Sequence, residues 1–352
     1  LLLEIIVVGN AITSSLLWPE FSWIALSVVG ILNLIIFILL VSRPVNKILR
    51  EFKALLTGKK YNRIYTKKVD EIGVIAHSFN AITSSLERVS TDIKEHRRIS
   101  SELNIAQKIQ QDLLPESAPN IPGLDIIAKT RPAAEIGGDS FDFITKGDQT
   151  FIYIGDVTGH GVPAGLVMMI VDTLLHTFSD MVENSHQLLT QVNKYLKPRI
   201  QSTMFMTMIM MRWIHQTKEL KFTGAGHETI VHYKAMDKSV TNEKAGGIAL
   251  GMVPDNEKLI KEETIPFQLG DFIVLYTDGI TESRNTEGEM FEEKKLIKII
   301  EKNAPSAASA AELFQRISTE VTHFIGDTIQ QDDMTLIVIR HGEKQETETE
   351  KT

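Results

Sequence analysis

The chain has 352 residues, of which 43% are hydrophobic and 23% charged, so it is long enough for two or three domains and its composition excludes a disordered protein. No cysteine is present, which excludes disulfides, thiolate metal sites and cysteine nucleophiles. The net charge of −8 is uneven: residues 1–42 hold two acidic side chains only, residues 43–114 hold 14 basic against 8 acidic, and residues 115–352 hold 23 against 35. An acidic main body argues against nucleic acid as a ligand.

The N-terminal residues 1–42 are predicted to form a membrane anchor. Residues 24–41 carry no charge and would make about 27 Å of helix, close to the ~30 Å hydrocarbon core. Residues 1–18 are a weaker candidate for a first membrane helix, and a buried core helix is the alternative for the second. Four cations follow the second helix directly: Arg43, Lys47, Arg50 and Lys53. Because cytoplasmic flanks carry an excess of cations, we expect the rest of the chain to be cytoplasmic, with membrane lipid as a partner of the anchor.

Residues 43–96 are predicted to form two amphipathic helices, because apolar residues recur at three- and four-residue steps over 45–56 and 72–86. Each helix has a single apolar face, so the pair cannot enclose a core alone, and pairing of two chains would bury both faces. Three features match a HAMP domain: Arg43-Pro44, the DEIG run at 70–73 and Phe79-Asn80. The segment resembles a HAMP domain, which implies a homodimer built on a parallel four-helix bundle; an inert juxtamembrane spacer is the alternative.

Residues 97–119 are predicted to form a helical coiled-coil linker. The apolar spacing of the preceding helix continues at heptad-like intervals to Leu113, and three prolines then stop the helix: Pro115, Pro119 and Pro122. One large domain is expected over residues 120–342, followed by a disordered tail over residues 343–352.

The large domain is predicted to be of the α+β class. Apolar, β-branched runs predict strands at residues 125–130, 151–157, 204–213, 219–223, 229–234, 272–277 and 335–340. Helical patterns occupy residues 163–180, 186–197, 292–303 and 307–325. Because strands and helices do not alternate strictly, antiparallel sheets with helices packed outside them are expected.

Aspartates stand at the ends of several of these strands. Asp139 follows two glycines, Asp156 ends the run FIYIGD, Asp278 ends FIVLYTD, and Asp332-Asp333 precede MTLIVIR. An unpaired carboxylate at the buried end of an apolar strand would cost several kcal/mol, and a divalent cation removes that cost. Oxygen ligands without His or Cys select Mg²⁺ or Mn²⁺. Any one of these aspartates taken alone is also typical of a turn, but four such positions at strand ends in one domain favour a metal centre.

The order of the motifs in this domain resembles the PPM (PP2C-like) protein phosphatases in their bacterial SpoIIE/RsbU-type branch. The matching motifs are IGGDSFD (136–142), GDVTGHG (155–161), AGH (225–227), YTDGITE (276–282) and QDDMT (331–335). The resemblance implies a β-sandwich of two antiparallel sheets flanked by helices, with two Mn²⁺ or Mg²⁺ ions at one end. It also implies hydrolysis of phosphoserine or phosphothreonine on a partner protein by metal-activated water, in a bacterial cell membrane setting.

The same resemblance implies roles for individual residues. Asp156 matches the aspartate that bridges both metals, and the Val157 carbonyl matches a backbone ligand. Asp139 matches an aspartate that acts near the second metal, usually through water. Asp278 and Asp332 match the carboxylates that complete the other metal's shell.

Other positions of the resemblance are less well matched. Asp333 stands where animal relatives often have Asn, so it is a weaker metal ligand candidate than Asp332. Arg131 is the candidate phosphate-binding residue, although this branch often lacks that arginine. His160 and His227 are expected to hold their loops rather than act as general acids. The helix pair over 163–197 is a candidate switch beside the metals.

The function expected from the sequence is a membrane-anchored, metal-dependent serine/threonine phosphatase of bacterial signal transduction, acting on a phosphorylated STAS (anti-anti-sigma-like) protein and so on sigma factor regulation. One alternative is a diguanylate cyclase-like enzyme, because GGDSF at 137–141 resembles the GGDEF signature and such enzymes also follow HAMP domains. The other alternative is a catalytically dead phosphatase fold that serves as a scaffold.

Overall fold

The computed structural model describes residue 9, residue 12, residues 22–67 and residues 70–343. The chain divides into two compact units, Leu1–Ile99 and Ser100–Thr352. The predicted first membrane helix over 1–18, apart from Gly9 and Ile12, and the predicted tail, apart from Glu343, lie outside the described residues.

The first unit contains a long apolar helical run. Helix α2 (Ser22–Phe37) passes through a π-helical turn, η2 (Ile38–Ser42), into α3 (Arg43–Leu56) without a break. Two described stretches are long and apolar enough to span a membrane, Ser27–Leu56 and the helix Val162–Ser179 of the second unit. The second is partly buried against its own domain, whereas the 18-residue apolar window of the first is not buried at all. Length and composition alone are weak evidence for a membrane anchor.

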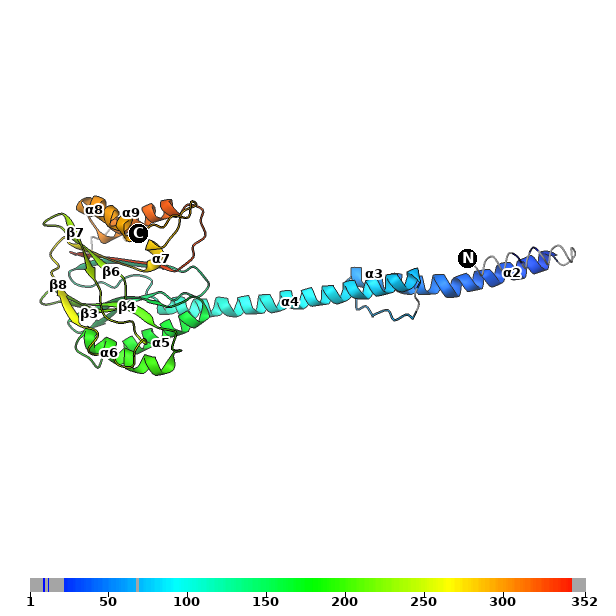
Figure 1. The fold of residues 1–352 in the computed structure, drawn as a ribbon, viewed down its shortest axis with the longest axis horizontal. Helices are drawn as coiled ribbons and strands as arrows, with labels where there is room; N and C mark the ends of the chain where they lie inside the picture. Colours follow the sequence, from blue (N-terminus) through cyan, green and yellow to red (C-terminus); the bar gives the residue numbers. More distant parts are fainter. Residues whose placement is uncertain (1–8, 10–11, 13–21, 68–69, 344–352) are drawn as a thin grey trace, which may run out of the picture. The chain divides into compact units, whose positions relative to one another are not determined.

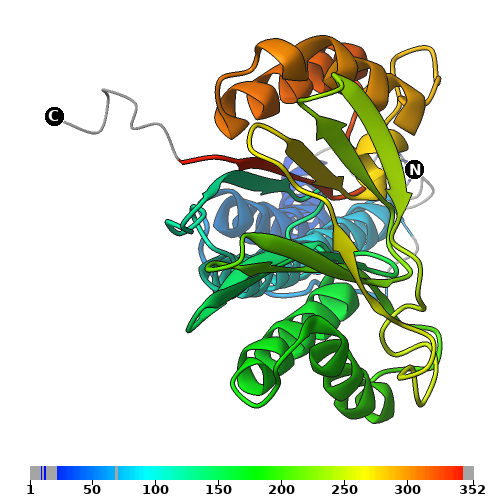
Figure 2. The same ribbon diagram turned by 90° about the vertical axis from the view of Figure 1, so that its left-hand side faces the viewer.

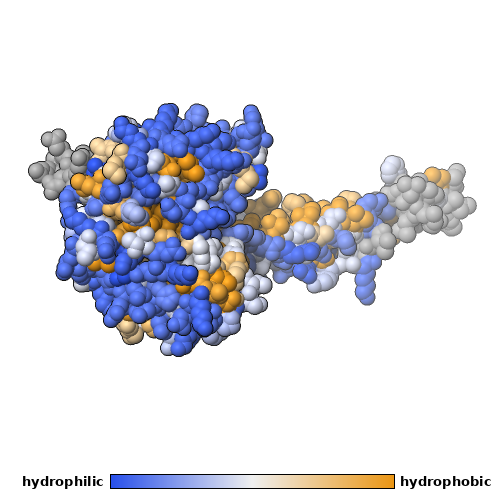
Figure 3. All heavy atoms as spheres, turned by 60° about the vertical axis from the view of Figure 1, so that its left-hand side comes forward, coloured by the Kyte–Doolittle hydropathy of each residue, from blue (hydrophilic) through white to orange (hydrophobic). Residues whose placement is uncertain are grey.

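A small core joins α3 to the N-terminal part of α4 (Glu71–Leu113) within the first unit. Ile48, Ile64 and Phe79 are buried in it. The Asn80 side chain accepts from the Ile64 N–H at 2.9 Å and donates to the Ile64 carbonyl at 2.8 Å. Other apolar side chains of α4 remain exposed: Val74, Ile75, Ile82, Leu86, Val89 and Ile93. Figure 3 shows apolar side chains gathered along the helices of the first unit, whereas the visible face of the second unit is mostly hydrophilic.

The second unit is a sandwich of two five-stranded antiparallel sheets (Figure 1). The first sheet has the order β1 (Leu124–Arg131), β10 (Met334–His341), β9 (Phe272–Tyr276), β6 (Thr229–Lys234), β7 (Ser239–Lys244). The second has the order β2 (Ser140–Lys146), β3 (Gln149–Val157), β4 (Met206–Ile214), β5 (Glu219–Ala225), β8 (Glu262–Ile265). The predicted α+β sandwich of antiparallel sheets is therefore confirmed.

Helices cover the outer face of each sheet, as Figure 2 shows. The inner faces of both sheets share one apolar core that includes Ile152, Trp213 and Ile337. Helices α5 (Val162–Ser179) and α6 (Ser185–Leu196) pack on the second sheet. Helices α8 (Glu293–Asn303) and α9 (Ala310–Ile325) pack on the first. The connecting loops are thus left at the ends of the sandwich, where the candidate site lies.

Candidate metal centre

The predicted carboxylates meet at one end of the sandwich. Asp139 immediately precedes β2, and the pairing of Ser140 with Gly155 places it beside Asp156 near the end of β3. Asp278 begins the short helix α7 (Asp278–Thr281) directly after β9, and Asp332 lies just before β10. β9 and β10 are hydrogen-bonded neighbours in the other sheet.

Hydrogen bonds from the first sheet hold the carboxylate of Asp139. The hydroxyl of Thr277 donates to Asp139 Oδ2 at 2.8 Å, and the hydroxyl of Thr335 donates to the same oxygen at 2.5 Å. Asp139 is only 5% exposed. The two sheets are therefore joined at the site through one buried carboxylate.

The carboxylates of the site repel one another. Burial, reinforced by the charges of Asp278 and Asp332, raises the pKa of Asp156 to about 7. Burial and the charge of Asp156 raise the pKa of Asp139 well above its ordinary value. Burial and Asp332 also raise the pKa of Asp278, and the nearby Glu282 adds to the rise.

No basic side chain of the described residues forms an ion pair with these carboxylates. Among the ion pairs of the described residues, none involves Asp139, Asp156, Asp278 or Asp332. Buried carboxylates without a basic partner are costly unless they are protonated or bind a metal. An all-oxygen donor set of this kind fits hard divalent cations such as Mg²⁺ and Mn²⁺.

The backbone around the two glycines brings the Asp139 loop close to Val157. A Cβ atom at Gly138 would lie 3.0 Å from the Val157 carbonyl oxygen, so this oxygen faces the loop. The side chain of Val157 points away and is fully buried among the residues under α5 and α6. The carbonyl predicted to be a ligand therefore lies beside the loop that carries Asp139.

Asp333 holds the loop that carries Asp139. Its Oδ1 accepts from the N–H of Ala133 at 2.7 Å, and its Oδ2 accepts from the N–H of Gly138 at 2.6 Å and of Asp139 at 3.4 Å. Asp333 is 4% exposed, whereas its neighbour Asp332 is exposed and accepts from the Asp333 N–H at 2.8 Å. Both oxygens of Asp333 are therefore engaged by backbone, and its ligand role stays a prediction.

Gln110 on α4 holds the same loop from the other side. Its side-chain amide donates to the Gly137 carbonyl at 2.7 Å and accepts from the Gly137 N–H at 3.0 Å. Gln110 is buried, and a Cβ at Gly165 of α5 would lie 3.1 Å from its nitrogen. The end of α4, the Asp139 loop and the first turn of α5 therefore meet at this amide.

Gln110, Thr277 and Thr335 were not among the site residues predicted from the sequence. Thr277 directly precedes Asp278, and Thr335 lies two residues after Asp333, so proximity to the predicted aspartates was their available signal. The only sequence signal for Gln110 was a polar side chain within a helix predicted from its apolar heptad pattern.

His227 connects the two sheets near the site. Thr207 of β4 donates to its Nδ1 at 2.7 Å, and its Nε2 donates to the Tyr276 carbonyl of β9 at 3.1 Å. Burial lowers the pKa of His227 to about 4, so it is neutral at physiological pH. These contacts suit the loop-holding role expected of it. The adjacent Glu228 adds another acidic group, since burial and Asp278 raise its pKa.

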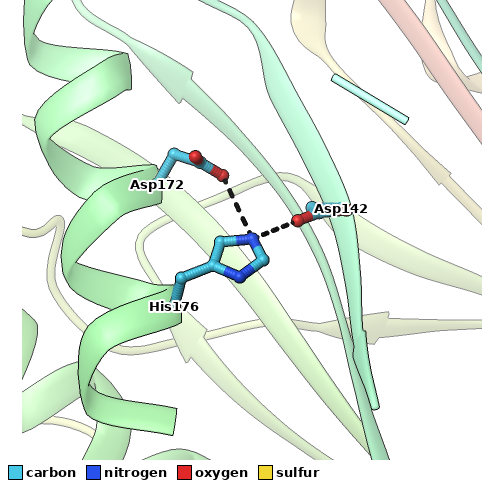
Figure 4. Close-up of side chains that lie close together, drawn as sticks. All are labelled: Asp142, Asp172 and His176. Atoms are coloured by element: carbon cyan, nitrogen blue, oxygen red, sulfur yellow. Dashed lines mark hydrogen bonds and ion pairs between the residues drawn. The ribbon is translucent and has the colours of Figure 1, made fainter. Parts of the chain in front are cut away.

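A second group of titratable side chains lies between β2 and α5 (Figure 4). His176 Nε2 lies 2.6 Å from Asp142 Oδ2 and 3.9 Å from Asp172 Oδ1, and Tyr153 donates to Asp172 at 2.8 Å. Their ligand atoms lie within 4.8 Å of one another. The hydrogen bond to Asp142 raises the pKa of His176. This group contains none of the predicted metal ligands and ties α5 to the second sheet.

The candidate phosphate-binding residue Arg131 lies at the exposed end of β1. Its backbone carbonyl accepts from Gln330 at 2.7 Å. Its side chain lines a groove of about 130 Å³ against α9, together with Phe314 and Val321. None of the predicted metal ligands lines that groove.

The fold and the carboxylates at its end define a phosphatase of the PP2C type. The family described as stage II sporulation protein E (SpoIIE) matches residues 146–342. The phosphoserine phosphatase RsbU of Bacillus subtilis (strain 168) is 32% identical over 244 residues, which cover 69% of this chain and 71% of RsbU. The chain therefore belongs to the SpoIIE family of PPM phosphatases, as predicted.

Solved structures agree with this fold. The SiaA-PP2C domain of Pseudomonas aeruginosa has a TM-score of 0.60 and 21% identity, covering 70% of this chain and 97% of that domain. The RsbU and RsbW domains of a Mycobacterium tuberculosis protein have a TM-score of 0.55 and 26% identity, covering 66% of this chain and 64% of theirs. The cyclase alternative is set aside by this family membership. The family match begins at residue 146, so the predicted domain boundaries, the HAMP domain and the anchor stay predictions.

Proposed function

We propose that this protein is a membrane-anchored, metal-dependent serine/threonine phosphatase that dephosphorylates a regulatory protein in bacterial signal transduction. The observation that carries the proposal is the convergence of Asp139, Asp156, Asp278 and Asp332 at one end of the sandwich. The raised pKa values of Asp139, Asp156 and Asp278, together with the absence of an ion pair to any of the four among the described residues, support a place for divalent cations.

The residues that would hold the cations are Asp156, Asp278, Asp332 and the Val157 carbonyl, with Asp139 acting near one of them. A bound pair of Mn²⁺ or Mg²⁺ ions supplies acidity for a water nucleophile and positive charge for the phosphoryl oxygens. Asp333 remains a weaker candidate ligand.

The chain itself supplies orientation. Thr277 and Thr335 donate to Asp139 and so fix which oxygen is left for the site. Asp333 and Gln110 fix the loop that carries Asp139, through its backbone groups. Such preorganisation removes the need for the site to rearrange during the reaction.

The proposed partner is a phosphorylated STAS-like, anti-anti-sigma-type protein. RsbU, the relative reported above, is named a phosphoserine phosphatase, and one solved neighbour combines RsbU and RsbW domains in a single chain. A role in sigma factor regulation follows from that analogy.

The proposed location is the bacterial inner membrane, with the catalytic unit in the cytoplasm. The proposed organisation is an anchor at 1–42, a HAMP domain at 43–96, a coiled-coil linker at 97–119 and the phosphatase at 120–342. The exposed apolar stripe of α4 supports a homodimer, because pairing of two chains would remove it from water.

The proposal is tested with the full chain in detergent and a phosphoserine protein of the STAS class. Phosphate release should require Mn²⁺ or Mg²⁺, stop with EDTA and fall at least about a hundredfold in Asp156→Asn. Asp180→Asn is the matched control, because Asp180 is 80% exposed and, among the described residues, forms its ion pair with Lys146. Full activity of Asp156→Asn would refute the metal assignment, and an inactive wild type that also fails to bind Mn²⁺ would favour the dead scaffold.

A further inference from the structure

A small cavity adjoins the metal centre on the side of α7. It has a volume of about 140 Å³ and lies between residues 279–284 and the segment that leads into β10. Asp332 lines it together with the backbone of Gly279, and Arg284 lines it as well. Pockets for whole small molecules measure about 300–1,000 Å³, so this cavity suits a single charged group.

The loop around Arg284 is closed on itself and presents its side chain at the surface. Arg284 and Met290 form an isolated β-bridge, and Asn285 Oδ1 accepts from the N–H groups of Glu287 and Glu289. The Arg284 guanidinium donates through Nη1 to the Gly288 carbonyl at 2.9 Å. One edge of the guanidinium is thereby fixed.

The other N–H donors of the Arg284 guanidinium have no hydrogen-bond acceptor among the described residues. No carboxylate of the described residues forms an ion pair with Arg284, although Glu282 and Asp332 line the same cavity. An arginine has five N–H donors, so most remain available to an anion that enters the cavity.

The other cations near the centre are placed differently. Lys129 lines a cavity of about 200 Å³ that reaches Asp139 and Asp333, but its Nζ donates to the Glu116 carbonyl at 3.1 Å. Arg131 lines the groove on α9, away from the predicted metal ligands. Arg284, in contrast, shares a cavity with Asp332, a carboxylate of the centre.

We propose that Arg284 binds the phosphoryl group of the substrate beside Asp332. This inference rests on the proposed phosphatase function. A dianionic phosphoryl group that approaches a cluster of carboxylates needs positive charge in addition to any metal, and guanidinium binds phosphate oxygens in a bidentate manner. Arg284 is then a substrate-binding residue, and Arg131 is not.

The test compares three variants of the full chain in detergent, with p-nitrophenyl phosphate as substrate and inorganic phosphate as product inhibitor. Arg284→Gln keeps a donor for the Gly288 carbonyl and removes the charge, Arg284→Lys keeps the charge, and Arg131→Gln tests the candidate predicted from the sequence. We expect Arg284→Gln to raise KM and the phosphate inhibition constant in parallel by about tenfold, with kcat within about twofold of wild type. Arg284→Lys should recover part of this loss, and Arg131→Gln should resemble wild type.

Phosphate binding measured by calorimetry in Mg²⁺ gives a second readout that needs no turnover. If the wild type releases no phosphate, the proposed function fails, yet weaker phosphate binding by Arg284→Gln than by wild type would still support this inference. Unchanged KM and unchanged phosphate affinity in Arg284→Gln would overturn it. A lowered melting temperature together with lost kcat in both Arg284 variants would mean that Arg284 stabilises its loop and does not bind phosphate. A raised KM in Arg131→Gln alone would mean that Arg131 binds the phosphate.

Discussion

Replacing Asp156 by Asn should stabilise the metal-free protein at neutral and alkaline pH. The pKa of Asp156 is about 7 in the folded protein, against 3.8 for an unperturbed aspartate. At about 1.4 kcal/mol per pH unit, ionised Asp156 lowers the free energy of unfolding by about 4 kcal/mol at pH 8. Because the folded pKa is the higher one, the metal-free wild type loses stability as pH rises from about 4 to about 7.

The assay follows thermal unfolding of the full chain by the change in tryptophan fluorescence, to which Trp213, fully buried between the two sheets, contributes. In EDTA at pH 8, Asp156→Asn should melt about 10 °C above wild type, since 1 kcal/mol corresponds to about 2–4 °C in a domain of this size. The difference between the two melting temperatures should become smaller toward pH 4. With Mn²⁺ the wild type should melt above Asp156→Asn, because an ion that binds only the folded wild type stabilises it.

Two results would contradict this reasoning. The first is a wild type that, in EDTA, is more stable at pH 8 than at pH 5. The second is an Asp156→Asn variant that is less stable than wild type at pH 8 without metal. Either would mean that the carboxylates of the centre are already compensated by protein groups.

Three further predictions concern residues around the centre. Gln110→Ala leaves the buried N–H and carbonyl of Gly137 without partners, so urea denaturation should show a loss of about 2 kcal/mol and assays a lower kcat. Asp333→Ala releases the loop that carries Asp139, so calorimetry should show at least about tenfold weaker Mn²⁺ binding. The Mn²⁺ affinity of Asp333→Asn should lie between those of wild type and Asp333→Ala. His176→Gln should destabilise at pH 6 by less than about 1 kcal/mol, because His176 is half exposed, and should have no effect at pH 9.

The pH dependence of the His176 prediction follows from its raised pKa, which Asp142 causes. Its ion pair contributes below the ordinary histidine pKa of about 6.5 and is lost as pH rises through the folded value. Gln111→Ala is the control for Gln110, because Gln111 is exposed on the same helix. Equal effects of the two glutamine variants, or equal effects of His176→Gln at both pH values, would count against these assignments.

The sequence indicated the strands that end in Asp156 and Asp278 because both are continuous apolar runs, and the structure brings those two ends together. It did not indicate β7 or β8, since SVTNEK is a polar, solvent-facing edge strand and EETI is only four residues long. β2 was missed because Asp142 interrupts its apolar pattern. The structure explains a carboxylate there by its contacts with His176 and with the Phe143 N–H.

Some features of the site depend on contacts between distant residues. Gln110 and Gly137 are 27 positions apart, and nothing in the local pattern of either residue specifies their pairing. Asp332 and Asp333 are adjacent and chemically identical, yet one is exposed and the other buried. Successive residues of an extended chain point to opposite sides, so tertiary packing decides which of the two faces the loop.

The place of β10 in the first sheet has a consequence for synthesis of the protein. This strand is inserted between β1 and β9. Hydrogen bonds of Asp333 and Thr335, at its N-terminal end, reach Ala133, Gly138 and Asp139, which lie 194–200 positions earlier. Contacts of such long range form late in folding. A chain that is still emerging from the ribosome therefore has no complete centre until β10 has been made and has paired with β1 and β9.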